Sequence, residues 1–282
     1  MSASLPDRAD FADWIGRASE RRDVLTPRLA AEFETTLAPY LARVEGAAPG
    51  LFWALAPDIA PMRDLGGDGH PRTGIFLPAL PFPRRMWAGG ELTFREPIRV
   101  GDEVVKTSVI EDIAFKNGAS GPLGFVVVRH AYAVRGRRAI EERQDLVYRP
   151  VNAASAASPR PGAPAGGVAR HWQVAADPVL LARYSAVTFN GHRIHYDAPY
   201  ATGVEGYAGL VVHGPLQATL MLNVAAEVLG RLPQKFRYRG LAPLICGAPF
   251  RVEALKGADG GLTTRIVSEA GVVTMAGSAE TQ

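Results

Sequence analysis

The segment from Leu216 to Gly230 constrains the fold most, because it reads as a helix with almost no polar face. An all-round apolar helix is normally a buried one. Gly214-Pro215 stands before it, and proline is tolerated there because its missing amide hydrogen would have no helical partner. Gly230 is a good helix terminator. The fold must therefore place this helix in its core.

The beginning of this helix also offers a chemical function. The first turn of a helix has free backbone amides and the positive end of the helix dipole. Such an end can hold a carbonyl oxygen as negative charge builds on it. The backbone amide of Gly214 is therefore our candidate for an oxyanion donor.

A polar segment from Tyr184 to Asp197 precedes the helix, and the shorter run Val212-His213-Gly214 leads into it. These stretches contain three of the six histidines of the chain, His192, His195 and His213. Apolar residues separate the polar ones. This interleaving suits a buried segment that directs a few polar side chains to one place.

The active-site segment of the MaoC-like hydratases and dehydratases resembles two runs of this chain, Thr188-Phe189-Asn190-Gly191-His192-Arg193-Ile194-His195-Tyr196-Asp197 and His213-Gly214-Pro215-Leu216. Within that group the chain is similar to hydroxyacyl-thioester dehydratase type 2 and to the mesaconyl-C4-CoA and itaconyl-CoA hydratases. The resemblance extends less tightly to Arg84-Arg85-Met86-Trp87-Ala88-Gly89-Gly90 and to Arg239-Gly240-Leu241-Ala242-Pro243-Leu244, so it covers most of the chain. It implies an α+β double hot-dog fold, in which two units, each a curved antiparallel sheet wrapped round a helix, form a pseudo-dimer.

The first part of the chain mixes helical and irregular sequence. Residues 7–46 have an amphipathic pattern that predicts helices. Residues 50–83 are rich in proline and glycine, and Leu51-Phe52-Trp53-Ala54-Leu55 is the one strand predicted there. Long irregular segments are often binding loops, or else disordered. Three arginines in or beside this stretch are candidate ligand contacts. The alternative, to which we give equal weight, is that they are solvated charges on a loop. They are Arg72, Arg84 and Arg85.

Strand patterns fill much of the remainder of the chain. Eight strands are predicted, and turns such as Asn117-Gly118 and Arg135-Gly136 separate them. They span residues 91–95, 103–115, 125–134, 139–148, 235–239, 248–255, 262–269 and 272–279.

A weak internal repeat relates the two groups of strands. Residues 94–101 match residues 238–247 through a Pro-aliphatic-x-x-Gly core, and such repeats indicate a duplicated fold. Residues 151–168 contain little but Ala, Ser, Pro and Gly, which predicts a linker. We therefore expect residues 1–150 to form an N-terminal hot-dog unit like the FAS1-like dehydratase N-terminal domain, and residues 169–282 a C-terminal MaoC-like unit. The first unit lacks the histidine segment, so we expect it to be a degenerate partner that shapes the substrate tunnel.

The composition excludes several classes of function. The net charge is +3 and the basic residues are scattered, a pattern too weak for nucleic-acid binding but compatible with an anionic ligand. The single cysteine, Cys246, excludes an intramolecular disulfide and any zinc site built from several cysteines. We see no hydrophobic run of membrane-spanning length and no signal-peptide pattern, so we expect no membrane partner and a cytoplasmic location.

The chemistry that the resemblance implies is the addition of water to an enoyl thioester. A base must activate the water and return a proton to the α carbon, and the thioester oxygen needs donors as enolate character develops. His195 is our candidate for the base, because the ordinary pKa of histidine lies near neutrality. The alternative is a core histidine whose hydrogen bonds are satisfied.

Asn190 departs from the wider pattern. In R-specific enoyl-CoA hydratases the residue five before the histidine is usually an aspartate that shares the water. A neutral amide can orient a water but cannot take its proton. His195 would then act alone, or with His192 or Asp197. The alternative for Asn190 is a turn residue before Gly191.

Four further residues are assigned to substrate binding, each with a structural alternative. Asp197 can orient the imidazole of His195, but a cap on the next helix is favoured because Pro199 follows. Arg193 can pair with the free carboxylate of a dicarboxylic acyl group, or it can lie on the surface. The four are His192, Arg193, His213 and Asp197.

A metal site is the alternative for the histidines. His192, His195, Asp197 and His213 are residue types that suit zinc or iron. The sequence has no zincin-type His-Glu-x-x-His, and the apolar interleaving fits a tunnel wall better. We therefore expect no metal.

The sequence thus predicts a cofactor-independent hydro-lyase, a hydratase or dehydratase that acts on the double bond of an enoyl-CoA thioester. The resemblance implies a CoA-linked substrate, with the C5 dicarboxylic groups of mesaconyl-C4-CoA or itaconyl-CoA as candidates. A hot-dog acyl-CoA thioesterase and a non-catalytic acyl-CoA-binding protein are the alternatives. We also consider a homodimer formed through exposed sheet edges.

Overall fold

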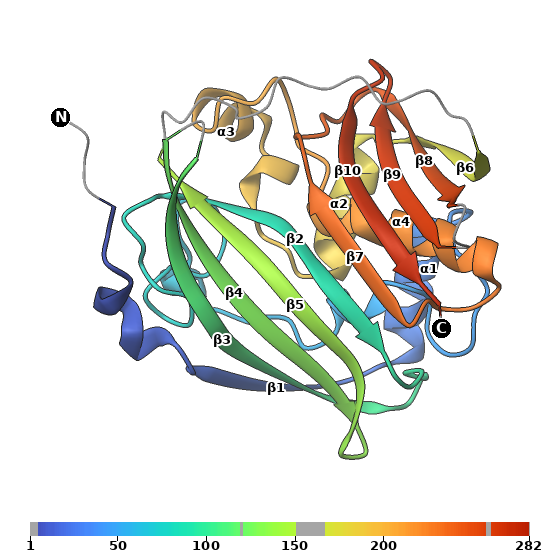
Figure 1. Ribbon diagram of the computed structural model, residues 1–282, viewed down its shortest axis with the longest axis horizontal. Helices are drawn as coiled ribbons and strands as arrows, with labels where there is room; N and C mark the ends of the chain where they lie inside the picture. Colours follow the sequence, from blue (N-terminus) through green and yellow to red (C-terminus); the bar gives the residue numbers. More distant parts are fainter. Residues whose placement is uncertain (1–4, 119–120, 151–166, 258–260, 282) are drawn as a thin grey trace.

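A ten-stranded sheet dominates the computed structural model, which describes residues 5–118, 121–150, 167–257 and 261–281 (Figure 1). The paired strands are antiparallel, in the order β1-β3-β4-β5-β2-β7-β10-β9-β8-β6. The strands are β1 (Ala18–Val24), β2 (Arg84–Phe94), β3 (Glu103–Gly118), β4 (Gly121–Val134), β5 (Arg137–Arg149), β6 (Val168–Ala175), β7 (Lys235–Gly240), β8 (Pro249–Lys256), β9 (Leu262–Ser268) and β10 (Val273–Glu280).

The strand order is the same in both halves of the sheet. Counted from its outer edge, the first half runs β1-β3-β4-β5-β2 and the second runs β6-β8-β9-β10-β7. The halves meet where β2 pairs with β7, from Gly89 opposite Arg239 to Thr93 opposite Lys235. The two copies of the sequence repeat stand at the ends of β2 and β7, which hold equivalent places. The predicted α+β double hot-dog fold is confirmed.

Glycines allow the two halves to approach closely at this junction. A Cβ atom at Gly90 would lie 2.3 Å from the carbonyl oxygen of Arg143 and 2.4 Å from the hydroxyl oxygen of Tyr238. A Cβ atom at Gly89 would lie 2.7 Å from the carbonyl oxygen of Tyr238. Real Cβ atoms do not come so close, so side chains here would force β2, β5 and β7 apart.

The predicted apolar helix is α4 (Gly214–Leu229), and every residue from Leu216 to Ala226 is buried. It ends at Gly230, which takes a left-handed conformation with φ 69°. The other α-helices are α1 (Pro27–Leu37), α2 (Pro178–Val187) and α3 (Ala198–Gly203). In Figure 1, α1, α2 and α4 lie behind the sheet.

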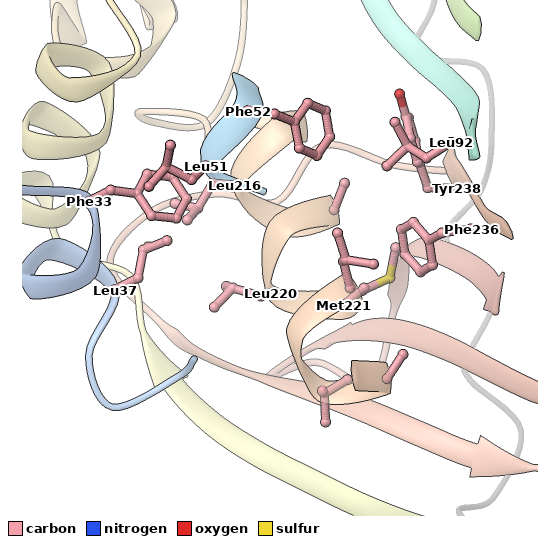
Figure 2. Close-up of a cluster of buried hydrophobic side chains, with 14 of the residues drawn as sticks. Phe33, Leu37, Leu51, Phe52, Leu92, Leu216, Leu220, Met221, Phe236 and Tyr238 are labelled. Carbon is pink, nitrogen blue, oxygen red and sulfur yellow. The ribbon is translucent and has the colours of Figure 1, made fainter. Parts of the chain in front are cut away.

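Buried side chains from both halves surround α4 (Figure 2). Phe33 and Leu37 of α1 lie on one side of the helix, and Phe236 and Tyr238 of β7 lie on the other. The core of the molecule is therefore shared by both halves. Among the described residues, no helix has both the length and the apolar composition needed to cross a bilayer.

Two predictions for the first part of the chain are wrong. Residues 7–46 contain the 3₁₀ helix η1 (Arg8–Trp14) and α1, but β1 lies between them. Because β1 is an edge strand with mostly exposed, charged side chains, it shows no strand period in the sequence. The strand predicted at residues 51–55 is instead the 3₁₀ helix η2 (Leu51–Ala54), which follows a left-handed Gly50. A short apolar run fits either structure when it is buried.

The eight predicted strands are all present. β2 begins earlier than predicted, at Arg84, and β6 is not predicted by the sequence patterns. Residues 151–166 of the predicted linker lie outside the described residues, and Val168 already belongs to β6. The division into units at residues 1–150 and 169–282 stays a prediction.

Asn223 ties α4 to the first half, and we expect its loss to destabilise the fold. The side chain is fully buried, accepts a hydrogen bond from the Ala42 amide at 3.0 Å and donates to the Pro49 carbonyl at 2.8 Å. Asn223→Ala should lower the free energy of unfolding by roughly 2–4 kcal/mol, because buried groups left without partners cost about 1–3 kcal/mol each. Denaturant unfolding followed by circular dichroism measures this loss.

The matched control for this prediction is Asn117→Ala, at an exposed position of β3. It should change the free energy of unfolding by no more than about 0.5 kcal/mol. An equally small change for Asn223→Ala would contradict the prediction.

Candidate active site

A cavity of about 1530 Å³ lies against the junction of the two halves. Residues of β2 and β5 in the first half line it, together with residues of β7 and of the segment that precedes α4 in the second half. Four of the seven predicted site residues line it. They are Asn190, His192, His195 and Gly214.

His195 ends the 3₁₀ helix η4 (Arg193–His195) and is only 6% exposed. Its Nδ1 donates to the carbonyl oxygen of Val211 at 2.7 Å, which fixes the tautomer and leaves the Nε2 lone pair free. Nε2 has no hydrogen-bond partner among the described residues and is accessible from the cavity. Burial lowers the pKa of His195 to about 3, so the imidazole is a neutral acceptor at neutral pH.

His213 lies behind His195 and not on the cavity wall. Its ring is fully buried and stacks on the ring of His195, with centroids 3.6 Å apart and planes 20° from parallel. Its Nε2 forms a hydrogen bond of 2.8 Å with the hydroxyl of Ser185. His213 is not among the residues that line the cavity, and its stacking on His195 fits its structural alternative, so its role in substrate binding stays a prediction.

Arg193 and Asp197 form an ion pair with each other and are not among the residues that line the cavity. The Nη2 and Nε atoms of Arg193 lie 2.7 Å and 2.9 Å from Oδ2 of Asp197. Asp197 also caps α3, as its favoured alternative predicts, by accepting from the Tyr200 amide at 3.1 Å. Since both charges are used in this pair, the structural alternatives for Arg193 and Asp197 are favoured, and their role in substrate binding stays a prediction.

Asn190 is a turn residue that also lines the cavity, and its role in orienting water stays a prediction. Its Oδ1 accepts from the amide of His192 at 2.9 Å, which makes it the turn residue that one alternative predicts. The preceding Phe189 has a positive φ of 51°, so the chain turns sharply here. Asn190 still lines the cavity, and its Nδ2 has no hydrogen-bond partner in the described part of the chain.

Gly214 is the first residue of α4, and its position has a packing reason as well as a chemical one. The preceding His213 makes no side-chain cap, so the amide of Gly214 stays among the unpaired amides of the helix start. A Cβ atom at Gly214 would lie 2.6 Å from Cε3 of Trp87. Only glycine therefore lets the indole lie against the exposed backbone of the helix start.

The structure adds a site residue that the sequence patterns do not single out. His70 lies on the loop from Asp64 to Arg72, which is closed by a hydrogen bond from the Arg72 amide to the Asp64 carbonyl. Its ring lies 4.4 Å from the ring of His192, which in turn lies 5.4 Å from that of His195. The one available signal is the position of His70 in the long irregular stretch that favours a binding loop.

Arg85 of β2, a predicted ligand contact, also lines the cavity. Its side chain is 12% exposed, and its Nη2 lies 3.7 Å from Oδ2 of Asp68. Arg84 points elsewhere and pairs with Glu205 at 3.1 Å. The cavity therefore has a positive group beside its histidines.

The residues whose geometry suits a metal ion are not the four histidine and aspartate residues considered from the sequence. Ligand atoms of Asp68, His70 and His192 lie within 4.8 Å of one another. The guanidinium of Arg85, close to Asp68, opposes a second cation at this point. We therefore assign no metal ligands here.

Comparisons with known proteins show the family of the chain. A sequence model of the family described as hydroxyacyl-thioester dehydratase type 2 matches residues 51–246. Mesaconyl-C(4)-CoA hydratase of Chloroflexus aurantiacus is 41% identical over 254 residues, which cover 89% of this chain and 91% of that protein. The mitochondrial hydroxyacyl-thioester dehydratase type 2 of Schizosaccharomyces pombe is 29% identical over 259 residues, which cover 82% of this chain and 85% of that protein.

Solved structures give the same fold. A MaoC-like dehydratase from Phytophthora capsici has a TM-score of 0.72 at 12% identity, over 98% of both chains. A Mycobacterium tuberculosis protein described as a double hotdog fold has a TM-score of 0.57 at 16% identity, over 98% of both chains. At these identities the likeness shows the fold alone. From the family match and the 41% identity, the chain belongs to the hydroxyacyl-thioester dehydratase type 2 family.

Proposed function

We propose that the protein catalyses the reversible addition of water to the double bond of an enoyl-CoA thioester. The observation that carries the proposal is the placement of His195, whose unpaired Nε2 is accessible from the cavity that Gly214 also lines. His195 stacks on His213, the residue directly before Gly214. A base and an oxyanion donor therefore stand close together, as the reaction requires.

Each of these groups has a defined part in the reaction. The amide of Gly214 and the positive end of α4 stabilise the thioester oxygen as it becomes an enolate oxygen. Nε2 of His195 takes a proton from water as the water oxygen attacks the β carbon, and then returns that proton to the α carbon. The Nδ1 hydrogen bond to the Val211 carbonyl keeps the imidazole in the correct orientation and tautomer.

The acyl chain that we propose is a branched C5 dicarboxylic one, as in mesaconyl-C4-CoA. The support is the 41% identity to a mesaconyl-C(4)-CoA hydratase and the presence of a cation in the cavity. Mesaconate is methylfumarate, so its C4 thioester keeps a free carboxylate on the β carbon. Arg193 is committed to Asp197, whereas Arg85 lines the cavity and its ion pair with Asp68 is long, at 3.7 Å. We therefore choose Arg85 as the partner of this carboxylate.

The function is tested by incubating the protein with straight-chain and C5 dicarboxylic enoyl-CoAs and following the loss of the conjugated double bond, with mass analysis of the products. We expect water addition, and His195→Ala should lower kcat by about 10²–10⁴-fold because it removes the general base. Release of free CoA would instead identify a thioesterase. Binding without turnover would identify a non-catalytic acyl-CoA-binding protein.

Arg85 gives a prediction about substrate choice. Arg85→Gln should lower kcat/KM for mesaconyl-C4-CoA by about 10–100-fold, because a charge-assisted hydrogen bond contributes about 1.5–3 kcal/mol. The change for crotonyl-CoA, which lacks the carboxylate, should stay within about threefold. Arg28→Gln, whose side chain is 78% exposed, is the control. Equal losses on both substrates would rule out a role for Arg85 in reading the carboxylate.

The buried histidines predict a specific pH dependence. Burial lowers the pKa of His195 to about 3 and that of His192 to about 2, whereas unfolded histidines titrate near 6.5. Below about pH 6.5 the unfolded state therefore binds more protons, and each such histidine reduces the free energy of unfolding by about 1.4 kcal/mol per pH unit. Activity on acidification should therefore fall together with the folded fraction.

Initial rates and circular dichroism measured over the same pH range test this prediction. Both signals should decline with one midpoint. A loss of activity centred near pH 6.5 in protein that is still fully folded would show instead that the base has an ordinary pKa.

A further inference from the structure

We propose that His70, held in place by Asp68, is the second residue that binds the reacting water, the part for which Asn190 lacks a carboxylate. The proposal rests on the hydratase function above and adds a catalytic residue from the first half of the chain. It changes the expected role of that half, which would supply chemistry as well as shape.

His70 lies on a loop that packs against the segment from Asn190 to His195. Its ring lies 4.4 Å from that of His192, and its side chain lines the same cavity as His195. The two imidazoles therefore line one cavity, and the ring of His192 lies against both.

The hydrogen bonding of His70 is incomplete, unlike that of a structural loop histidine. Its Nδ1 is buried without a hydrogen bond and lies 3.7 Å from Oδ2 of Asp68. Its Nε2 has no hydrogen-bond partner among the described residues. Buried side-chain polar atoms in folded proteins nearly always have partners, so an exception calls for a functional reason.

Asp68 is held so that it can orient His70. Its Oδ1 accepts from the backbone amide of His70 at 3.0 Å, and its carbonyl oxygen accepts from the Arg193 amide at 2.9 Å. Burial opposes ionisation, but the backbone hydrogen bond from His70 and the positive charge of Arg85 hold the pKa of Asp68 well below its ordinary value. An anionic Asp68 beside Nδ1 favours the Nδ1–H tautomer and leaves the Nε2 lone pair as an acceptor.

The distance of 3.7 Å is too long for a hydrogen bond in the structure as it stands. Catalytic hydrogen bonds of this kind are often long without substrate and tighten in the substrate complex. A small rotation of either side chain closes the gap.

Close backbone contact fixes this loop to residues Gly191 to Arg193. A Cβ atom at Gly69 would lie 2.0 Å from the Gly191 carbonyl oxygen, and one at Gly191 would lie 2.7 Å from the Gly69 carbonyl oxygen. Arg193 donates from Nη1 to the Gly67 carbonyl at 2.9 Å. His70 is therefore positioned with the precision that a catalytic group needs.

In the proposed addition of water, His195 and His70 have different roles. One O–H bond of water breaks and its proton passes to Nε2 of His195, while the C–O bond forms at the β carbon. The π electrons move toward the α carbon and the thioester oxygen, and the proton on His195 then goes to the α carbon. The second O–H bond stays intact, becomes the product hydroxyl and donates a hydrogen bond to Nε2 of His70 throughout. His70 aims the attacking oxygen and gains no proton.

The first experiment compares His70→Ala and His70→Gln with wild type on the best enoyl-CoA substrate of the panel. His70→Ala should lower kcat by about 100-fold with KM within about threefold. His70→Gln should recover part of this loss because its amide oxygen can accept a hydrogen bond. His171→Ala, at an exposed position of β6, should have wild-type rates.

Two results would overturn the proposal. One is a folded His70→Ala variant with kcat within about threefold of wild type, and the other is a loss confined to KM. These results are distinct from failure of the proposed function, in which wild-type protein itself adds no water.

A double-mutant cycle tests the link between His70 and Asp68. Asp68→Asn should lower kcat by about tenfold, and in the His70→Ala background it should cost nothing further, because it acts through His70. Full additivity of the two losses would refute the link. In His70→Ala, adding Asn190→Asp should restore at least about tenfold in kcat, because it supplies a carboxylate acceptor. A double variant no faster than His70→Ala would show that the two positions do not share one role.

A chelator separates this proposal from a metal site. Wild-type protein dialysed against EDTA should keep its full rate. Loss of activity that zinc restores would make Asp68, His70 and His192 metal ligands and would overturn the proposal.

Discussion

The contact between Gly214 and the indole of Trp87 is the constraint on which the site depends. Trp87 belongs to β2, and its ring stacks on that of Tyr238 of β7, with centroids 4.5 Å apart. The indole therefore lies where the two halves of the sheet meet, and α4 begins directly against it. The free amide at the start of α4 is thus positioned by both halves together, and a change at the junction would move the proposed oxyanion donor relative to His195.

A buried carboxylate reinforces the same junction. Glu142 of β5 is 1% exposed and accepts hydrogen bonds of 3.0 Å from Nε1 of Trp53 and from the hydroxyl of Tyr238. Burial raises its pKa, and burying such a group is costly unless donors surround it. Because the Tyr238 donor comes from β7, this hydrogen bond joins the two halves at a buried carboxyl group. We interpret it as a group that favours one register of the two halves over others.

The sequence predicts those parts of the site that depend on neighbours in the chain. The apolar period of α4, its glycine start and the His195 segment are local patterns, and the structure places them as expected. The segment also contains Arg193. The sequence alone does not show whether its guanidinium binds a substrate carboxylate or, as in the structure, Asp197 and the Gly67 carbonyl. The place of His70 depends on a loop contact between distant parts of the chain, and no local pattern reports such a contact. That the first half only shapes the tunnel stays a prediction, and the role that we propose for His70 would replace it.

The low pKa of His195 follows from the burial of its ring, and the reaction offsets the energetic cost of charging it. Burial penalises the imidazolium before the reaction begins, which makes His195 a weak base in the ground state. In the transition state, however, positive charge on this ring forms together with negative charge on the thioester oxygen. Opposite charges attract strongly where water is excluded, so the surroundings that disfavour the isolated imidazolium favour the pair. The stacking of His195 on His213, next to Gly214, keeps the two developing charges close enough for this attraction to act.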